Sequence, residues 1–212
     1  MTRFPDAHTH VARALPRAFD LLNVELPFAG QLNEHRCYSV GLHPWSDPVE
    51  WDAGLEQLEQ WITLPQVRAV GECGLDKRRG APLEQQKELF VRQIDLAVEH
   101  KKPLMLHNYK AADEMLELHA KYGDTAWILH GFRANTLVME MFLKRGFYFS
   151  YGYHFNEEAL LKTPLDHLLL ETDEASEVEL IGLYERVAEL LKMDTGNLAG
   201  LMRKNMRRLF SM

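Results

Sequence analysis

Short apolar segments alternate with amphipathic segments along almost the whole chain, and this alternation restricts the fold more than any other feature. Eight segments have the apolar character of strands, at 3–9, 19–25, 37–41, 68–74, 104–106, 126–129, 146–150 and 167–170. Seven others space their apolar residues as helices do, at 51–62, 82–100, 111–122, 135–145, 156–162, 177–192 and 197–209. Near-continuous apolar strands separated by helices predict an α/β protein with a parallel sheet. Eight such strands predict a (β/α)8 TIM-type barrel.

The length of the chain makes this a compact barrel. Its 212 residues predict one domain, 1–212, at the short end of the range for this fold. The first three strands follow one another closely, so we expect one or two early helices to be missing. A doubly wound open sheet is the structural alternative, although no glycine-rich phosphate loop follows the first strand.

Polar side chains stand at the carboxyl ends of five predicted strands, which in a parallel barrel converge on one mouth. In the opening Asp-Ala-His-Thr-His motif, strand alternation places Asp6, His8 and His10 on one face. The predicted metal ligands are His8, His10, Glu72, His107, His130 and Asp173. Four imidazoles and two carboxylates suit zinc, manganese, iron or nickel, and in part magnesium. Six ligands exceed the needs of one tetrahedral ion, which favours a two-metal site bridged by Glu72.

Each residue also has an ordinary structural explanation. A single histidine at a strand end is more often hydrogen-bonded or exposed than bound to a metal. Glu72 lies between glycines, as a turn carboxylate does, and Asp173 is suited to capping a helix. The prediction rests on the joint pattern, because one architecture brings all six residues to the same rim.

Further polar residues lie close to these ligands in sequence. Asp6 and Asp76 are expected to support the ligands from behind. Substrate contacts are expected from His43, Arg133, and Lys77 and Arg78 of the basic run 77–79. A loop-packing role for His43 and a solvated face for the basic run are the alternatives. The tryptophans, at 45, 51, 61 and 127, are expected in or near the core.

Composition excludes several classes of protein. A formal net charge of −7 argues against a protein that coats nucleic acid electrostatically. The two cysteines form no CxxC pair, which argues against a zinc ribbon or a thioredoxin-like motif. No apolar run approaches the roughly 18 residues of a membrane helix. With no signal peptide visible, the expected compartment is the cytoplasm, with both thiols reduced.

Seven segments carry a resemblance to a known family: 6–10, 40–44, 69–76, 103–107, 128–132, 168–173 and 205–210. In order and spacing the chain resembles the TatD-type metal-dependent hydrolases, the TatD-related deoxyribonucleases of the amidohydrolase-like superfamily. The resemblance implies a (β/α)8-type barrel with a divalent, usually two-metal, centre on the six ligands named above. It also implies phosphodiester hydrolysis.

The chain departs from the family pattern around the mouth. It is shorter than usual, and the segment between the opening motif and Gly41 is compressed. The family's proline-containing loop after Asp173 is replaced by a run directly into a helix. After His130, Gly131-Phe132-Arg133 stands where the family has Cys-Phe and small polar residues. The hydrolytic chemistry therefore carries over better than the DNA substrate does.

These observations predict a phosphodiesterase or deoxyribonuclease-like enzyme in which two metal ions activate a water. Asp173 is expected to act as general base, Glu72 to bridge the ions, and a small phosphoester or a DNA end to be the substrate. One alternative is a C–N or lactone hydrolase, in which a carboxylated lysine often takes the bridging place that Glu72 has here. The other is a non-catalytic barrel that serves as a binding scaffold.

Overall fold

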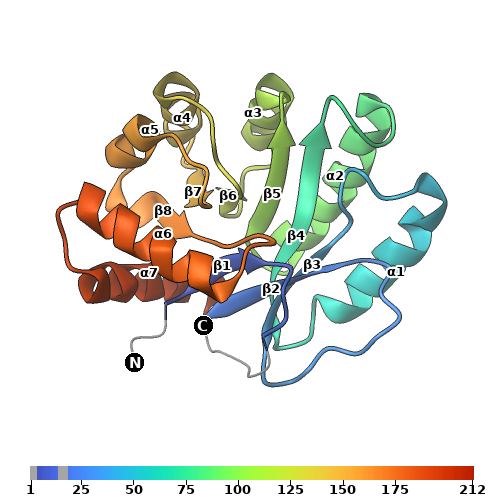
Figure 1. Ribbon diagram of the computed structural model, residues 1–212. Coiled ribbons are helices and arrows are strands. Elements are labelled where there is room, and N and C mark those ends of the chain that lie inside the picture. The colour runs from blue at the N-terminus through green and yellow to red at the C-terminus, as the bar shows by residue number, and fades with distance from the viewer. Residues whose placement is uncertain (1–3, 14–18) are drawn as a thin grey trace.

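Eight parallel strands form one sheet whose order follows the chain (Figure 1). The computed structural model describes residues 4–13 and 19–212. The strands are β1 (Asp6–Thr9), β2 (Asp20–Glu25), β3 (Cys37–Gly41), β4 (Val67–Asp76), β5 (Leu104–Tyr109), β6 (Trp127–Leu129), β7 (Tyr148–Tyr151) and β8 (Leu168–Leu170). The eight predicted strands are confirmed, except that residue 3 lies outside the described residues. β4 and β5 extend further than predicted, because their polar ends stay in register as Leu75 pairs with Asn108 and Asp76 with Tyr109.

The sheet curls into a barrel that closes between β1 and the residues after β8. Thr9 forms a parallel bridge with Asp173. The His10 amide donates to the Asp173 carbonyl at 2.8 Å, and the Asp173 amide donates to the His8 carbonyl at 3.0 Å. The predicted TIM-type barrel is therefore confirmed, and its closure brings the first and last predicted ligand segments together.

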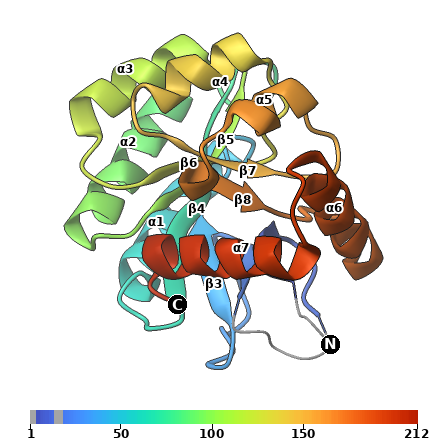
Figure 2. The ribbon, with the colours of Figure 1, turned by 90° about the vertical axis from the view of Figure 1, so that its left-hand side faces the viewer.

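In the described part of the chain, seven α-helices surround the sheet (Figure 2). They are α1 (Trp51–Trp61), α2 (Leu83–Glu99), α3 (Ala112–Tyr122), α4 (Thr136–Leu143), α5 (Glu157–Lys162), α6 (Glu177–Leu190) and α7 (Thr195–Phe210), with short 3-10 turns η1 (Pro48–Glu50) and η2 (Leu165–His167). Polar caps begin several of them: Asn135 accepts from the Val138 amide, and Ser176 forms a capping box with Glu179. α7 begins two residues before its predicted start because Asp194 caps it.

The early connections carry no helix in their described residues. Residues 10–13 and 19 lead from β1 to β2, and residues 26–36 lead from β2 to β3, as turns and irregular chain. The first helix after the sheet begins, α1, follows β3. The expectation of a compact barrel without one or two early helices is therefore met in the described part of the chain.

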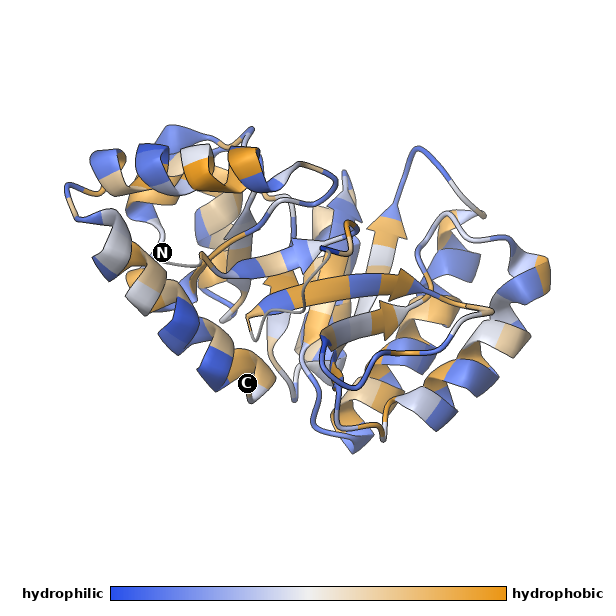
Figure 3. Ribbon diagram, turned by 60° about the horizontal axis from the view of Figure 1, so that its bottom comes forward, coloured by the Kyte–Doolittle hydropathy of each residue, from blue (hydrophilic) through white to orange (hydrophobic). Residues whose placement is uncertain are grey.

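The apolar core has two parts. The larger part lies between the strands and the helices. The strands are mainly hydrophobic, and each helix has a hydrophobic and a hydrophilic side (Figure 3). The smaller joins strand residues such as Ala7, Met105 and Leu169 to Met206 and Phe210 of α7. α7 also contacts the strand starts, where Asn205 donates to the Leu165 and Leu168 carbonyls and Arg208 lies over the Tyr148 ring. α7 therefore covers the amino-terminal end of the barrel and leaves the carboxyl end as the open mouth.

No helix among the described residues combines the length and the apolar character needed to cross a membrane.

Candidate metal centre

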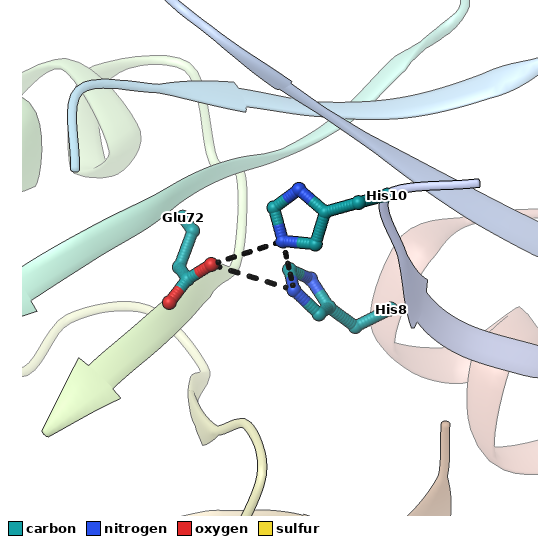
Figure 4. Close-up of side chains that lie close together, drawn as sticks. All are labelled: His8, His10 and Glu72. Atoms are coloured by element: carbon teal, nitrogen blue, oxygen red, sulfur yellow. Dashed lines mark hydrogen bonds and ion pairs between the residues drawn. The ribbon is translucent and has the colours of Figure 1, made fainter. Parts of the chain in front are cut away.

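His8 in β1 and His10 directly after it both point toward the carboxylate of Glu72 on β4 (Figure 4). The Nε2 atoms of His8 and His10 lie 3.2 Å apart. Glu72 Oε2 lies 3.5 Å from His8 Nε2 and 3.4 Å from His10 Nε2. Asp173 Oδ1 lies 3.9 Å and 3.6 Å from the same two nitrogens. One group of donor atoms therefore gathers around the end of β1.

The other oxygen of Glu72 faces a second group of rings. Glu72 Oε1 lies 2.7 Å from His130 Nε2, 3.1 Å from His107 Nδ1 and 3.2 Å from His43 Nε2. The structure thus brings together the six residues that the sequence predicts as ligands. His43, a predicted substrate contact, also lies among them.

The charges on Glu72 and His130 stabilise each other. Burial opposes a charge on Glu72, but the His130, His10 and His107 rings outweigh it and hold the pKa of its carboxyl well below its usual value. Burial also opposes a charge on His130, but the Glu72 and Glu171 carboxylates raise the pKa of this ring well above its usual value. The Glu72 carboxylate is therefore charged and available as a ligand at neutral pH, whereas a metal ion on His130 would displace the proton that this ring holds.

The donor atoms fit divalent ions. Ligands about 2.1 Å from a tetrahedral ion lie roughly 3.4 Å from one another. His8, His10 and Glu72 present nitrogen and oxygen atoms at 3.2 to 3.5 Å. Two further sets hold ligand atoms within 4.8 Å of one another: His8, His130 and Asp173, and His43, Glu72 and His107. Imidazole and carboxylate donors are those that zinc, manganese and related ions use.

Two glycines of β4 set the position of Glu72. Gly71 and Gly74 have φ values of +142° and +134°, and Gly74 pairs with His107 of β5. A Cβ on Gly71 would stand 2.3 Å from the Met105 carbonyl oxygen, and one on Gly74 would stand 2.1 Å from that of His107. Only glycine allows β4 to approach β5 this closely, and this approach carries Glu72 to the His107 ring.

The two predicted supporting carboxylates occupy different surroundings. Asp76 Oδ2 lies 3.0 Å from His107 Nε2, on the side of the ring away from Glu72. Asp6 makes no such contact with a ligand ring; it accepts hydrogen bonds from Arg13 and from the amide and hydroxyl of Thr172. Burial raises the pKa of Asp6 to about 6. Asp6 therefore ties β1 to the residues after β8 and supports His8 and His10 through the backbone.

The predicted substrate residues are spread around the mouth. Arg78 and Arg133 are exposed. Lys77 forms a 2.8 Å ion pair with Glu114 of α3. His43 lies inside the cluster, as described above. All three basic side chains are exposed, and Lys77 is the one with an acidic partner given above.

Sequence reasoning missed Glu171, which is fully buried directly after β8. Its Oε1 lies 3.2 Å from His130 Nδ1 and accepts a 2.6 Å hydrogen bond from the Gly131 amide. A carboxylate on the far nitrogen of a ligand ring fixes the tautomer and orientation of that ring. An acidic residue two positions before Asp173 in Glu-Thr-Asp was the available signal, since alternate strand residues share a face.

The tryptophans agree only partly with the prediction of core positions. Trp127 is buried, and Trp51 and Trp61 are partly buried and pack against the core. Trp45, by contrast, is 41% exposed beside the cluster. Its indole donates to Asp76 Oδ2 at 2.8 Å, so a polar contact holds it at the rim instead of apolar packing in the core.

Replacing Glu171 with glutamine is expected to weaken metal binding about 10- to 100-fold, the usual effect of losing a carboxylate behind a ligand histidine. Titration of chelator-treated protein with manganese or zinc measures this affinity. Glu189→Gln on the exposed side of α6 is the matched control. Equal affinities for Glu171→Gln and the unsubstituted protein would show that His130 needs no support.

Comparisons with known proteins identify relatives of this chain. The family model described as TatD related DNase matches residues 23–211. An uncharacterized metal-dependent hydrolase of Bacillus subtilis, YabD, is 29% identical over 81% of this chain and 76% of its own length. The 3'-5' ssDNA/RNA exonuclease TatD of Escherichia coli is 31% identical over 65% of this chain, which spans only 57% of that relative.

The fold is also similar to that of a solved structure. The crystal structure of YjjV, a TatD homologue from Escherichia coli, superposes with a TM-score of 0.79 at 25% identity. The superposition covers 91% of this chain and 86% of the YjjV chain. The similarity therefore includes nearly all of the barrel.

Proposed function

Because this chain belongs to the TatD-related DNase family, we propose that it is a metal-dependent hydrolase of phosphodiester bonds in nucleic acid. The proposed ligands of two divalent ions are His8, His10, Glu72, His107, His130 and Asp173. We propose residues 1–212 as a single catalytic domain. The two free cysteines agree with a reducing, cytoplasmic compartment.

The observation that carries this proposal is the position of the Glu72 carboxylate between two groups of rings. Its Oε2 faces His8 and His10, while its Oε1 faces His107 and His130. A carboxylate with one oxygen toward each group is suited to bridging two ions. In the proposed arrangement Glu72 takes the place that a carboxylated lysine has in many C–N and lactone hydrolases, which favours phosphodiesters as substrates.

Divalent ions in this place would lower the pKa of a water from about 15.7 toward neutrality and offset the charge of a phosphate group. The chain supplies the remaining functions. Asp173 is one-third exposed at the mouth, so its carboxylate can accept the proton of that water as general base. Asp76 and Glu171 hold His107 and His130 in fixed orientations. Arg78 and Arg133, which are both exposed, are the proposed contacts to a non-bridging phosphate oxygen.

The proposed substrate is a DNA or RNA end, or a small phosphodiester. Support comes from the relatives named as ssDNA/RNA exonucleases and, in Homo sapiens, as a 3'-5' RNA nuclease. A net charge of −7 disfavours tight electrostatic binding of a long duplex. Recognition of a strand end needs only local contacts at the mouth.

The test is an activity panel on protein reconstituted with zinc, manganese, magnesium or nickel. We expect hydrolysis of single-stranded oligonucleotides and small phosphodiesters, and none of amides or lactones. Asp173→Asn is expected to lower kcat about 10²- to 10⁴-fold, the range for a lost general base.

Asp95→Asn, on the exposed side of α2, is the matched control for the loss of a carboxylate. Full phosphodiesterase activity of Asp173→Asn with metal retained would refute the assignment of the base. Turnover of amides or lactones alone would refute the proposed reaction. An absence of bound metal together with no turnover would favour a binding scaffold.

A further inference from the structure

Trp45 is an exposed aromatic residue whose ring contacts two histidines of the proposed metal centre. Its ring centroid lies 4.5 Å from that of His43 and 5.3 Å from that of His107. Asp76 links the two sides, since its Oδ2 accepts from the Trp45 indole at 2.8 Å and lies 3.0 Å from His107 Nε2. A group that rests on Trp45 therefore lies next to the rings that would hold the metal.

Arg79 completes a surface with Trp45. Its guanidinium carbon lies 3.8 Å from the centroid of the Trp45 ring, and its amide donates to Asp76 Oδ1 at 3.1 Å. The loop after β3 and the loop after β4 pack tightly here, because a Cβ on Gly80 would stand 2.0 Å from the Pro44 carbonyl oxygen. We name the pair Trp45 and Arg79 the stacking wall. It is held by both loops and reaches solvent beside the mouth.

We propose that the stacking wall binds the nucleobase next to the scissile phosphate and thereby selects unpaired nucleic acid. This inference rests on the proposed function and specifies its substrate. Aromatic rings and guanidinium planes are the groups on which unpaired bases stack, whatever their sequence. A base inside a duplex has both faces covered and is unavailable. The positive charge of Arg79 also favours the adjacent phosphate.

The wall explains an otherwise unfavourable arrangement. An indole exposed to water loses part of the burial that stabilises tryptophan elsewhere. Here the Asp76 contact keeps it in place beside the cluster. Within the basic run 77–79, Lys77 forms an ion pair with Glu114, whereas Arg79 lies against the Trp45 ring.

The test compares two single-stranded oligonucleotides that differ only by an abasic residue, placed in turn on each side of the scissile phosphate. Trp45→Ala is expected to reduce kcat/KM for the strand with the base about 5- to 150-fold, mainly through KM, and to leave the ratio for the abasic strand close to unity. Trp45→Phe, which keeps a ring but loses the indole donor, is expected to retain most of the preference. Arg79→Gln is expected to reduce the preference for the strand with the base, as Trp45→Ala does.

Phe28→Ala is the matched control. Phe28 is also 41% exposed, but it contacts α1 through Gln57 and Trp61. Its removal is expected to leave kcat/KM unchanged for both strands. Metal content and thermal unfolding of each variant identify losses that come from a damaged centre.

Three outcomes would overturn the inference. If Trp45→Ala lowers kcat/KM equally for both strands, the residue supports only Asp76 and His107. If it lowers neither, the ring binds no base. If the unsubstituted enzyme hydrolyses neither strand, the proposed function fails, and strand binding to chelator-treated protein decides the inference: a base-dependent loss of affinity in Trp45→Ala sustains it, and an equal affinity overturns it.

Discussion

A Glu72→Gln variant is expected to lose its bound divalent metal and at least about 10³-fold of its phosphodiesterase activity, while remaining folded. Glutamine keeps the shape of the side chain, but it removes the negative charge that both groups of imidazoles face. Its amide nitrogen cannot accept a hydrogen bond or bind a cation, so one of the two proposed ions would lose the ligand that Glu72 supplies. Elemental analysis of protein purified without chelator, together with kcat on a single-stranded oligonucleotide, measures both effects.

A surface carboxylate provides the control for this substitution. Glu99→Gln, at the exposed end of α2, removes one charge without touching the cluster and is expected to leave metal content and kcat unchanged. Circular dichroism of Glu72→Gln separates loss of metal from loss of fold. Retention of full metal content and more than a tenth of the activity would contradict the proposed bridging role of Glu72.

Much of the cluster was predictable because parallel barrels place the carboxyl ends of all their strands at one mouth. Once the apolar runs of β1, β4, β5, β6 and β8 were recognised, the polar residues at their ends were expected to meet there. The structure brings them together as expected. The short early connections were predictable for a simpler reason: too few residues lie between β1 and β3 for two helices.

Other features depend on tertiary contacts that no local pattern reveals. Glu171 is fully buried, and its role depends on His130, which lies 41 positions earlier and on another strand. Asp6 shares a strand face with His8 in the pattern, but its carboxylate accepts hydrogen bonds from Thr172 and Arg13 and contacts no ligand ring. Trp45 is of a residue type expected in the core, but a hydrogen bond to Asp76 and the Arg79 guanidinium hold it at the rim. Each outcome is decided by a partner distant in sequence.

The glycines of β4 give the second large prediction. Gly74→Ala is expected to lower the free energy of unfolding by about 2 to 6 kcal/mol, from a disfavoured backbone conformation and from overpacking together. The new Cβ would stand 2.1 Å from the His107 carbonyl oxygen, so β4 and β5 must separate or the barrel must distort. Either change moves Glu72 away from His107 and weakens metal binding. Denaturant unfolding and metal titration measure the two effects.

Gly146→Ala is a matched control because it introduces backbone strain of the same kind as Gly74→Ala without a steric clash. Gly146 also has a positive φ, +84°, but a Cβ there would meet nothing within 4 Å. Its substitution is expected to cost only about 1 kcal/mol, the price of a left-handed residue, and to leave metal affinity unchanged. If Gly74→Ala costs no more than Gly146→Ala, the close approach of β4 to β5 does not position Glu72. A larger cost accompanied by weaker metal binding would mean that the glycine spacing of β4 is part of the centre.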